Sequence, residues 1–243
     1  MGVIHSNTPA MKNRSIATLL LSLLILSSCF EEDPGPRQAD SRQYAIVDFD
    51  RIQAGDALVI TIKQGNSFSI QADGDRRNLN DLLVYKNGNA LVLRYDHYQK
   101  RQYNTTLTIT MPVLNGSDFS GAVNAQVSGF TNLNSFDVSL SGASLVQLDI
   151  EASEFYFSVS GGSQLRLNGK GELISGSLSG ASLLSAFTYS STKAKVIVSG
   201  ASHGKVTVSQ QLEVNASGAS VVIYRGNPQL DVEATGESIV KQE

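Results

Sequence analysis

A short glycine motif recurs seven times along the second half of this chain, and it constrains the fold more than any other feature. Four copies read Ser-Gly-Ala-Ser, and the others are variants of it, down to Thr-Gly-Glu-Ser in the last copy. Successive motif glycines are 18 to 21 residues apart. A repeat of this length is typical of a solenoid, in which each repeat forms one coil and stacks on the next. The motif glycines are Gly121, Gly142, Gly161, Gly180, Gly200, Gly218 and Gly236.

The residues between the motifs alternate between apolar and polar types. The columns two residues before each glycine, and four and six residues after it, are mostly apolar, which is the period-two pattern of a β-strand. The pattern predicts an all-β chain whose repeats read strand, turn, strand, turn and stack as a single-stranded parallel β-helix. The chirality of parallel crossovers predicts a right-handed coil. A β-sandwich also contains many short strands, but it does not explain one turn motif in every repeat.

We interpret the motif itself as the corner of each coil. Glycine adopts the positive φ of a tight turn without the strain that a Cβ would cause. The serine two residues after the glycine shares the parity of the apolar columns, so we expect an inward ladder of hydroxyls that bond to neighbouring coils. These serines are Ser144, Ser163, Ser182, Ser202, Ser220 and Ser238. A stacked turn accounts for the motif without a ligand, so the seven glycines are assigned a structural role.

Residues 44–112 carry strand patterns without the repeat. Asn87-Gly88, between two alternating runs, is typical of a two-residue hairpin turn. We expect antiparallel hairpins here, and they would cover one end of the solenoid. The prediction is a single domain over 44–243, with 44–112 as its hairpin-rich part and 113–243 as its repeat coils. The alternating runs are residues 57–63, 68–72, 82–85, 90–95 and 105–111.

A solenoid also needs protection at its far end, because an open strand edge invites pairing with other chains. The last repeat departs from the pattern at Glu237. The final residues, Lys241-Gln242-Glu243, are polar or charged. This predicts a charged edge strand at the C-terminal end.

The N-terminal segment has the features of a bacterial export signal. Lys12 and Arg14 precede an apolar run over 16–26, which is too short to span a bilayer comfortably. The run leads into Leu26-Ser27-Ser28-Cys29, which resembles a lipobox, the signal at which a peptide is cut before a cysteine that then carries lipid. We therefore predict a signal peptide over 1–28, with Met11 as an alternative start.

Cys29 is the only cysteine in the sequence, so no internal disulfide is expected. Its lipidation would anchor the chain to a membrane, through a flexible tether over 29–43. The acidic residues 31–33 resemble the signal that sends Bacteroidetes-type lipoproteins to the outer face of the outer membrane. We predict an outer-membrane lipoprotein, and leave both surface exposure and a periplasmic orientation open.

The charge and residue content argue against several function classes. Without the signal peptide the net charge is −5, from 17 basic and 22 acidic residues, which disfavours nucleic acid as a partner. The three histidines and one cysteine show no metal-binding spacing. Asp149, Glu151 and Glu154 cluster within one coil, but neighbouring repeats do not extend the cluster as a polysaccharide lyase or hydrolase would require. The sequence therefore assigns no catalytic residue, no metal and no cofactor.

The segment over 94–103 is the distinctive surface candidate. Tyrosine and arginine side chains interleave there near a hairpin tip; both types favour interfaces, and aromatic rings can stack on sugars. The alternative interpretation is a charged strand end that covers one cap of the helix. The predicted binding surface, for a glycan or a protein ligand, consists of Arg94, Tyr95, Tyr98, Arg101 and Tyr103.

Taken in order, these features resemble the putative auto-transporter adhesin, head GIN domain family. The resemblance covers residues 44–240 and rests on the run 49–55, the Asn87-Gly88 hairpin before Leu91-Val92-Leu93, and the repeated corners. It implies an exported, mostly Bacteroidetes protein with a right-handed β-helix, and it carries over no catalytic residue. The predicted function is a cell-envelope lipoprotein that serves as a non-catalytic adhesin or binding module. The alternatives are a carbohydrate-active β-helix enzyme and an envelope scaffold protein.

Overall fold

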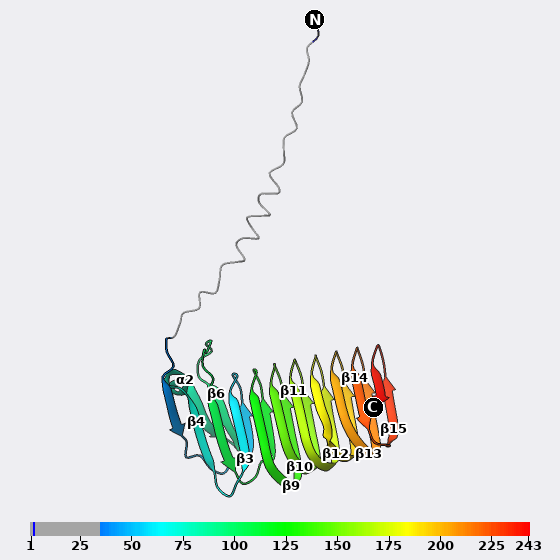
Figure 1. Ribbon diagram of the computed structural model, residues 1–243, viewed down its shortest axis with the longest axis horizontal. Coiled ribbons are helices and arrows are strands. Elements are labelled where there is room, and N and C mark those ends of the chain that lie inside the picture. The colour runs from blue at the N-terminus through cyan, green and yellow to red at the C-terminus, as the bar shows by residue number, and fades with distance from the viewer. Residues whose placement is uncertain (1, 3–34) are drawn as a thin grey trace. The chain divides into compact units, whose positions relative to one another are not determined.

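Each glycine motif forms a corner at which the chain passes from one coil of a parallel β-solenoid to the next (Figure 1). The computed structural model describes residue 2 and residues 35–243, and every described helix and strand lies within one unit, residues 37–243. Cys29 and the predicted signal peptide, apart from Gly2, lie outside the described residues. Among the described helices, none has the length and apolar character needed to cross a membrane.

The predicted tether, residues 29–43, extends too far along the chain. Residues 39–43 form strand β1 (Ala39–Gln43) and pair antiparallel with β4 (Ser69–Asp75). Alternating burial is visible along β1, although every residue after Ala39 in this strand is polar. Backbone hydrogen bonds to β4, rather than an apolar pattern, therefore place this segment on the sheet.

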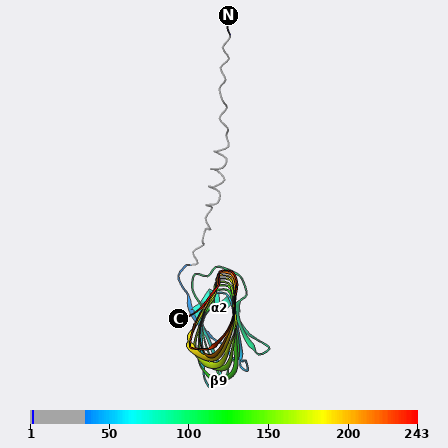
Figure 2. The ribbon, with the colours of Figure 1, turned by 90° about the vertical axis from the view of Figure 1, so that its right-hand side faces the viewer.

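Five long strands form the middle of the solenoid, and each pairs in parallel with the next. The glycine corner of the predicted repeat is correct, but the second turn is a bend inside a continuous strand, and three of the four ladders shift register there. Figure 2, a view along the stack, shows the coils superposed as a flattened ring. The prediction of an all-β parallel solenoid, with coils of roughly 19 residues, is confirmed. The five strands are β9 (Asn124–Leu140), β10 (Leu145–Val159), β11 (Gln164–Leu178), β12 (Leu183–Val198) and β13 (His203–Ala216).

The corners are held together by their own backbone. The seven motif glycines have φ between +62° and +77°. At five consecutive corners, the residue after the glycine donates its N–H to the carbonyl of the glycine one coil earlier, at 2.8 to 2.9 Å. A Cβ added to Gly161 would lie 2.5 Å from the carbonyl oxygen of Gly142, so stacking leaves no space for a side chain. The positive φ and the close stacking of the corners together account for the repeated glycine.

The expected inward serines are present at these corners. All of them are buried except Ser238, which is half-buried in the last coil. The hydroxyl of Ser182, for example, donates to the carbonyl of Val159 at 3.1 Å and lies 3.2 Å from the hydroxyl of Ser202. The serines therefore continue the core to the corner, with their hydroxyl groups hydrogen-bonded within the corner or to adjacent coils.

The apolar columns fill the space between the two faces of each coil. Phe136 and Phe155 stack on consecutive coils with ring centroids 5.9 Å apart. Tyr189 lies on β12, two coils from Phe155 on β10, and the centroids of their rings are 5.8 Å apart. Burial of such a side chain contributes about 1.5 to 3 kcal/mol to stability. Because the columns repeat, the core is continuous along the stack.

The prediction of antiparallel hairpins over 44–112 is only partly correct. β5 (Leu82–Asn87) and β6 (Ala90–Tyr95) form the expected antiparallel hairpin through Asn87-Gly88. β3 (Val59–Gln64) and β4, however, do not pair with each other. β7 (Thr106–Met111) lies between them, parallel to β3 and antiparallel to β4. Strand alternation is the same in parallel and antiparallel ladders, so the sequence pattern could not distinguish the two.

The first coil of the solenoid therefore begins inside this N-terminal part. β2 (Arg51–Ala54) pairs in parallel with β6 on one side and with β8 (Gly116–Phe119) on the other. β8 then pairs in parallel with the second half of β9. β2 and β3 together act as a coil that stacks directly on the repeats.

A charged pair fastens this first coil to a strand two positions farther along the stack. Arg51 on β2 reaches across Gly116 on β8, and its Nη1 donates to Oδ1 of Asp137 on β9 at 2.7 Å. The hydrogen bond with Asp137 raises the pKa of Arg51. A Cβ on Gly116 would lie 2.7 Å from the guanidinium carbon, so the glycine provides the space that the bridge uses.

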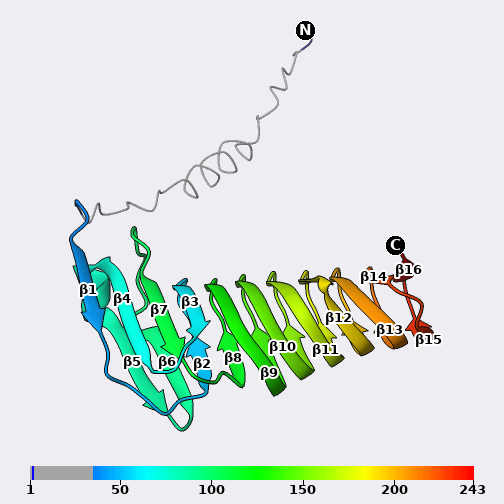
Figure 3. The same ribbon diagram turned by 60° about the horizontal axis from the view of Figure 1, so that its bottom comes forward.

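The two ends of the solenoid differ. At the N-terminal end, α2 (Arg76–Asp81) and β1 lie beside β4 (Figure 3). Asp75 caps α2, and its carboxylate accepts from the backbone N–H of Arg77 at 3.0 Å and of Gln38 at 2.8 Å. The other end consists of β14 (Val221–Arg225), β15 (Gln229–Ala234) and β16 (Ile239–Gln242). It carries charged residues, as predicted, but it also exposes apolar ones.

Candidate functional site

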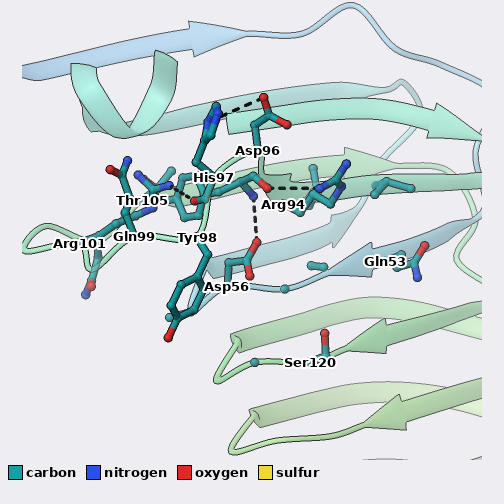
Figure 4. A pocket seen from close by; sticks show the side chains of 18 of the residues that line it. Gln53, Asp56, Arg94, Asp96, His97, Tyr98, Gln99, Arg101, Thr105 and Ser120 are labelled. Carbon is teal, nitrogen blue, oxygen red and sulfur yellow. Dashed lines mark hydrogen bonds and ion pairs between the residues drawn. The ribbon is translucent and has the colours of Figure 1, made fainter. Parts of the chain in front are cut away.

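A groove of about 830 Å³ opens beside the first corners of the solenoid. Its walls come from the end of β2, the end of β6, residues 96–105 and the corner at Ser120-Gly121 (Figure 4). β2 and β6 pair in parallel, so their carboxyl ends meet at the same edge of the sheet. The groove is thus assembled from segments that are distant in sequence.

The corner between β2 and β3 forms the floor on one side. Asp56 and Ala57 have φ of 60° and 56°, and they replace the glycine of the later corners. The N–H of Ala57 donates to the carbonyl of Gly121 at 2.8 Å, which stacks this corner on the first motif corner. The carboxylate of Asp56 accepts from the backbone N–H of Tyr95 at 2.9 Å. One side chain therefore ties the corner to the end of β6.

Arg101 holds the loop that follows β6. Its guanidinium carbon lies 3.4 Å from the centroid of the Tyr95 ring, in a cation–π contact. The same group forms an ion pair with Asp81 at the end of α2, and donates to Asn78 Oδ1 at 3.2 Å and to the carbonyl of His97 at 3.1 Å. These contacts fix the base of the loop against the helix.

Tyr95 lines the groove, and its side chain is buried. Its hydroxyl donates to Oγ1 of Thr105 at 2.7 Å, so the beginning and the end of the loop are joined. Burial raises the pKa of the Tyr95 phenol. The phenol therefore stays protonated at neutral pH and keeps its role as a donor.

Asp81, Asp96 and His97 place three possible metal-ligand atoms within 4.8 Å of one another. Burial disfavours the charged form of Asp81, but hydrogen bonds from His97 and Arg101 outweigh burial and lower its pKa. Nδ1 of His97 lies 2.6 Å from Oδ1 of Asp81, and this hydrogen bond raises the pKa of His97. Because both oxygens of Asp81 already face positively charged or donor groups, we assign no cation to this cluster.

The structure separates the five residues of the predicted binding surface. Tyr98 is fully exposed and lines the groove, and Arg94 is also exposed there. Tyr95 and Arg101 line the groove too, but their side chains serve to support the loop. Tyr103 is half-buried, and its carbonyl accepts from Asn78 Nδ2 at 2.7 Å.

Sequence reasoning missed the residues contributed by other segments. Gln53, Asp56, Tyr85 and Ser120 all line the groove. Asp56-Ala57 follows Gly55 near the start of the first coil. Recognising this turn as equivalent to a motif corner could have predicted that Asp56 lies at the corner edge of the stack. Nothing in the local sequence links it to the loop after β6.

Two residues of the acidic cluster, Glu151 and Glu154, contact neighbouring side chains near the second turn of the coil. Glu151 pairs with Lys170 on the next coil at 3.3 Å. Glu154 accepts from the hydroxyl of Tyr156, two residues along the same strand, at 2.8 Å. Both carboxylates are thus engaged in surface contacts on the outside of the solenoid.

Residues 48–228 match the sequence model of a family described as "Putative auto-transporter adhesin, head GIN domain". The chain belongs to this family. No protein of curated function matches the chain. The head GIN match begins just before β2 and ends just after β14, so it includes the groove and nearly all coils.

Solved structures share the head GIN solenoid. A putative adhesin of Bacteroides fragilis has a TM-score of 0.76 at 19% identity, covering 86% of this chain and 98% of that one. A putative adhesin of Parabacteroides distasonis reaches 0.69 at 15%, with coverage of 86% and 98%. A putative lipid binding protein from the same species reaches 0.66 at 15%, with coverage of 85% and 97%. At these identities the likeness establishes the common fold.

Proposed function

We propose that this head GIN protein is an envelope-anchored, non-catalytic adhesin that binds a carbohydrate in the groove. The observation that carries the proposal is the fully exposed ring of Tyr98, on a loop whose base is held by Arg101. A sugar can stack its C–H face on such a ring. Gln53, Gln99 and Ser120 line the same groove and offer donors and acceptors for hydroxyl groups.

The use of the groove's carboxylates supports binding rather than catalysis. Glycosidases place two carboxyl groups about 5 to 9.5 Å apart on either side of the scissile bond. Here the carboxylate of Asp56 accepts from the Tyr95 backbone, and that of Asp96 lies 3.8 Å from His97. The adhesin names of its relatives also support a role in attachment. A carbohydrate-active enzyme is the rival function.

Binding is tested on an array of bacterial glycans, host glycans and extracellular-matrix proteins, with the chain from residue 30 onward, which includes every described element. We expect glycan binding by the wild type, and at least about ten-fold weaker binding for Tyr98→Ala. Tyr156→Ala, an exposed tyrosine on β10, is the matched control and should bind like the wild type.

Three results would overturn the proposal. They are wild-type binding only to extracellular-matrix proteins, glycan binding that Tyr98→Ala leaves unchanged, and release of shortened products from a bound polysaccharide. The last result would establish the rival enzyme function.

The anchor is a separate part of the proposal. We propose that lipid on Cys29 holds the solenoid at the outer membrane, with the groove exposed to the medium. Cys29→Ser should move the protein from the membrane to the soluble fraction. Protease added to intact cells should degrade the solenoid; protection of the solenoid would instead support a scaffold inside the envelope.

A further inference from the structure

The C-terminal end of the solenoid presents core positions to solvent. Leu230 and Val232 on β15 are 46% and 39% exposed, whereas their register partners on β13, Leu212 and Val214, are 0% and 1% exposed. Val240 on β16 continues the column of the buried Val222 but is only half-buried itself. The inward face of the last coil is therefore apolar and uncovered within the part of the chain that the structure describes.

The backbone at this end also has unused pairing edges. Among the described strands, β15 pairs only with β13, and β16 pairs only with β14. Solenoids need a covered end, because an open parallel edge is a template for another strand. At the opposite end, β1 and α2 supply that cover.

We propose that a second copy of this chain covers the C-terminal end. The two copies dock end to end about a two-fold axis that runs parallel to the strands, and β16 of each copy pairs antiparallel with β15 of the other. The two apolar end faces then pack against each other and join the two cores. The contact is self-complementary, as a two-fold interface must be.

The pitch of the solenoid selects this arrangement. A coil climbs as it runs, so β16 lies half a coil farther along the stack than β15 on the opposite face. An axis parallel to the strands places β16 of each copy beside β15 of the other copy. Because β16 lies half a coil farther along the stack than β15, both strand pairs then reach the usual spacing of about 4.8 Å. An axis perpendicular to the strands would bring β16 against β16 and leave a gap of about one strand between the two β15 edges.

The outward charges favour the same arrangement. Asp231 and Glu233 point outward on β15, in the columns of Glu213 and Asn215, and Lys241 points outward on β16, in the column of Ile223. Pairing of β16 with β15 places Lys241 opposite acidic side chains. Pairing of β16 with β16 would instead bring the Lys241 side chains of the two copies near each other, and like charges are unfavourable across a ladder.

Sedimentation equilibrium of the chain from residue 30 onward tests the dimer. We expect a dimer for the wild type at about 10 to 100 μM, and at least ten-fold weaker association for Val232→Lys. Ile197→Lys, on an outward and exposed position of β12, is the matched control and should remain dimeric. A wild-type monomer across this range, or a Val232→Lys dimer of unchanged strength, would overturn the proposal.

Cysteine cross-linking tests the arrangement, because residues 30–243 contain no cysteine. Under the proposed pairing, a chain with both Asp231→Cys and Lys241→Cys should form covalent dimers on oxidation. Each single variant should not, because its new thiols lie on opposite faces of the joined stack. Efficient cross-linking of Lys241→Cys alone would show β16 against β16 and contradict the proposed axis.

Discussion

The hydroxyl of Tyr189 donates a hydrogen bond of 3.0 Å to the carbonyl of Ala152, two coils away in the stack. The strand between them, β11, carries Gly171 at this position, and a Cβ there would lie 2.2 Å from both oxygen atoms. Burial raises the pKa of Tyr189 to about 12, so its hydroxyl remains a donor at neutral pH. Arg51 and Asp137 bridge across Gly116 in the same manner. At both places a glycine outside the motif leaves room for a long side chain that spans three strands.

We expect Gly171→Ala to lower stability more than Tyr189→Phe. Loss of the buried hydrogen bond in Tyr189→Phe should cost about 1 kcal/mol, or roughly 2 to 4 °C in the unfolding midpoint. The new methyl group of Gly171→Ala meets backbone as well as phenol. Tyr189→Phe removes one of these two clashes, so the double variant should be less destabilised than the sum of the single variants. Thermal unfolding followed by circular dichroism measures all three, and strict additivity would contradict the bridge.

Two glycines with similar φ should respond differently to alanine. Gly161 at a motif corner has φ +71°, and Gly88 in the β5–β6 turn has φ +61°. Both variants acquire backbone strain of about 1 to 2 kcal/mol. Only Gly161→Ala also places its Cβ 2.5 Å from a neighbouring carbonyl, since nothing lies within 4 Å of a Cβ at Gly88. We expect a clearly larger loss in urea unfolding for Gly161→Ala, and equal losses would show that stacking does not require the motif glycine.

Asp75 should make the N-terminal cap sensitive to acid. The side-chain hydrogen bond from Arg77 is the main cause that holds the pKa of the buried Asp75 carboxyl well below its usual range. Its contribution is fully present above the unfolded-state pKa of about 3.9 and is lost as the pH falls below that value. The stability difference between the wild type and Asp75→Asn should therefore shrink between about pH 5 and pH 2. Asp118→Asn, at an exposed position, is the control variant.

His97 should have the opposite pH dependence. Its pKa is raised in the folded protein by the hydrogen bond to Asp81, so its contribution is fully present below about pH 6.5 and is lost as the pH rises through the folded value. His97→Gln should differ from the wild type in its unfolding midpoint at pH 5.5 and approach it at pH 9. His203→Gln on β13 is the control. A His97→Gln difference that grows with pH would contradict the assigned pair.

The glycine period and the alternating columns were sufficient to predict the solenoid, because both reflect local constraints. A positive φ demands glycine wherever the corner occurs, and period two defines which side chains face inward. The order of strands in the N-terminal part could not be predicted from the same signals. β7 between β3 and β4 has the same alternation as the hairpin that was expected.

The candidate site shows the same limit. The sequence identified the segment that carries Tyr98 and Arg101, but gave both residues the same role. The structure turns Arg101 onto Tyr95 and Asp81, because α2 brings an acidic partner from twenty residues earlier in the chain.

By itself, the sequence determined the coil, its length and the inward ladder of serines, since turn geometry and side-chain parity are properties of neighbouring residues. Only the tertiary structure decided where the groove lies, because Asp56, Tyr95 and Ser120 meet through parallel pairing of β2 with β6 and β8. It also decided that the last coil leaves Leu230 and Val232 uncovered, since exposure depends on which strand comes next in the stack. Parallel neighbours come from distant parts of the chain, and no local pattern specifies them.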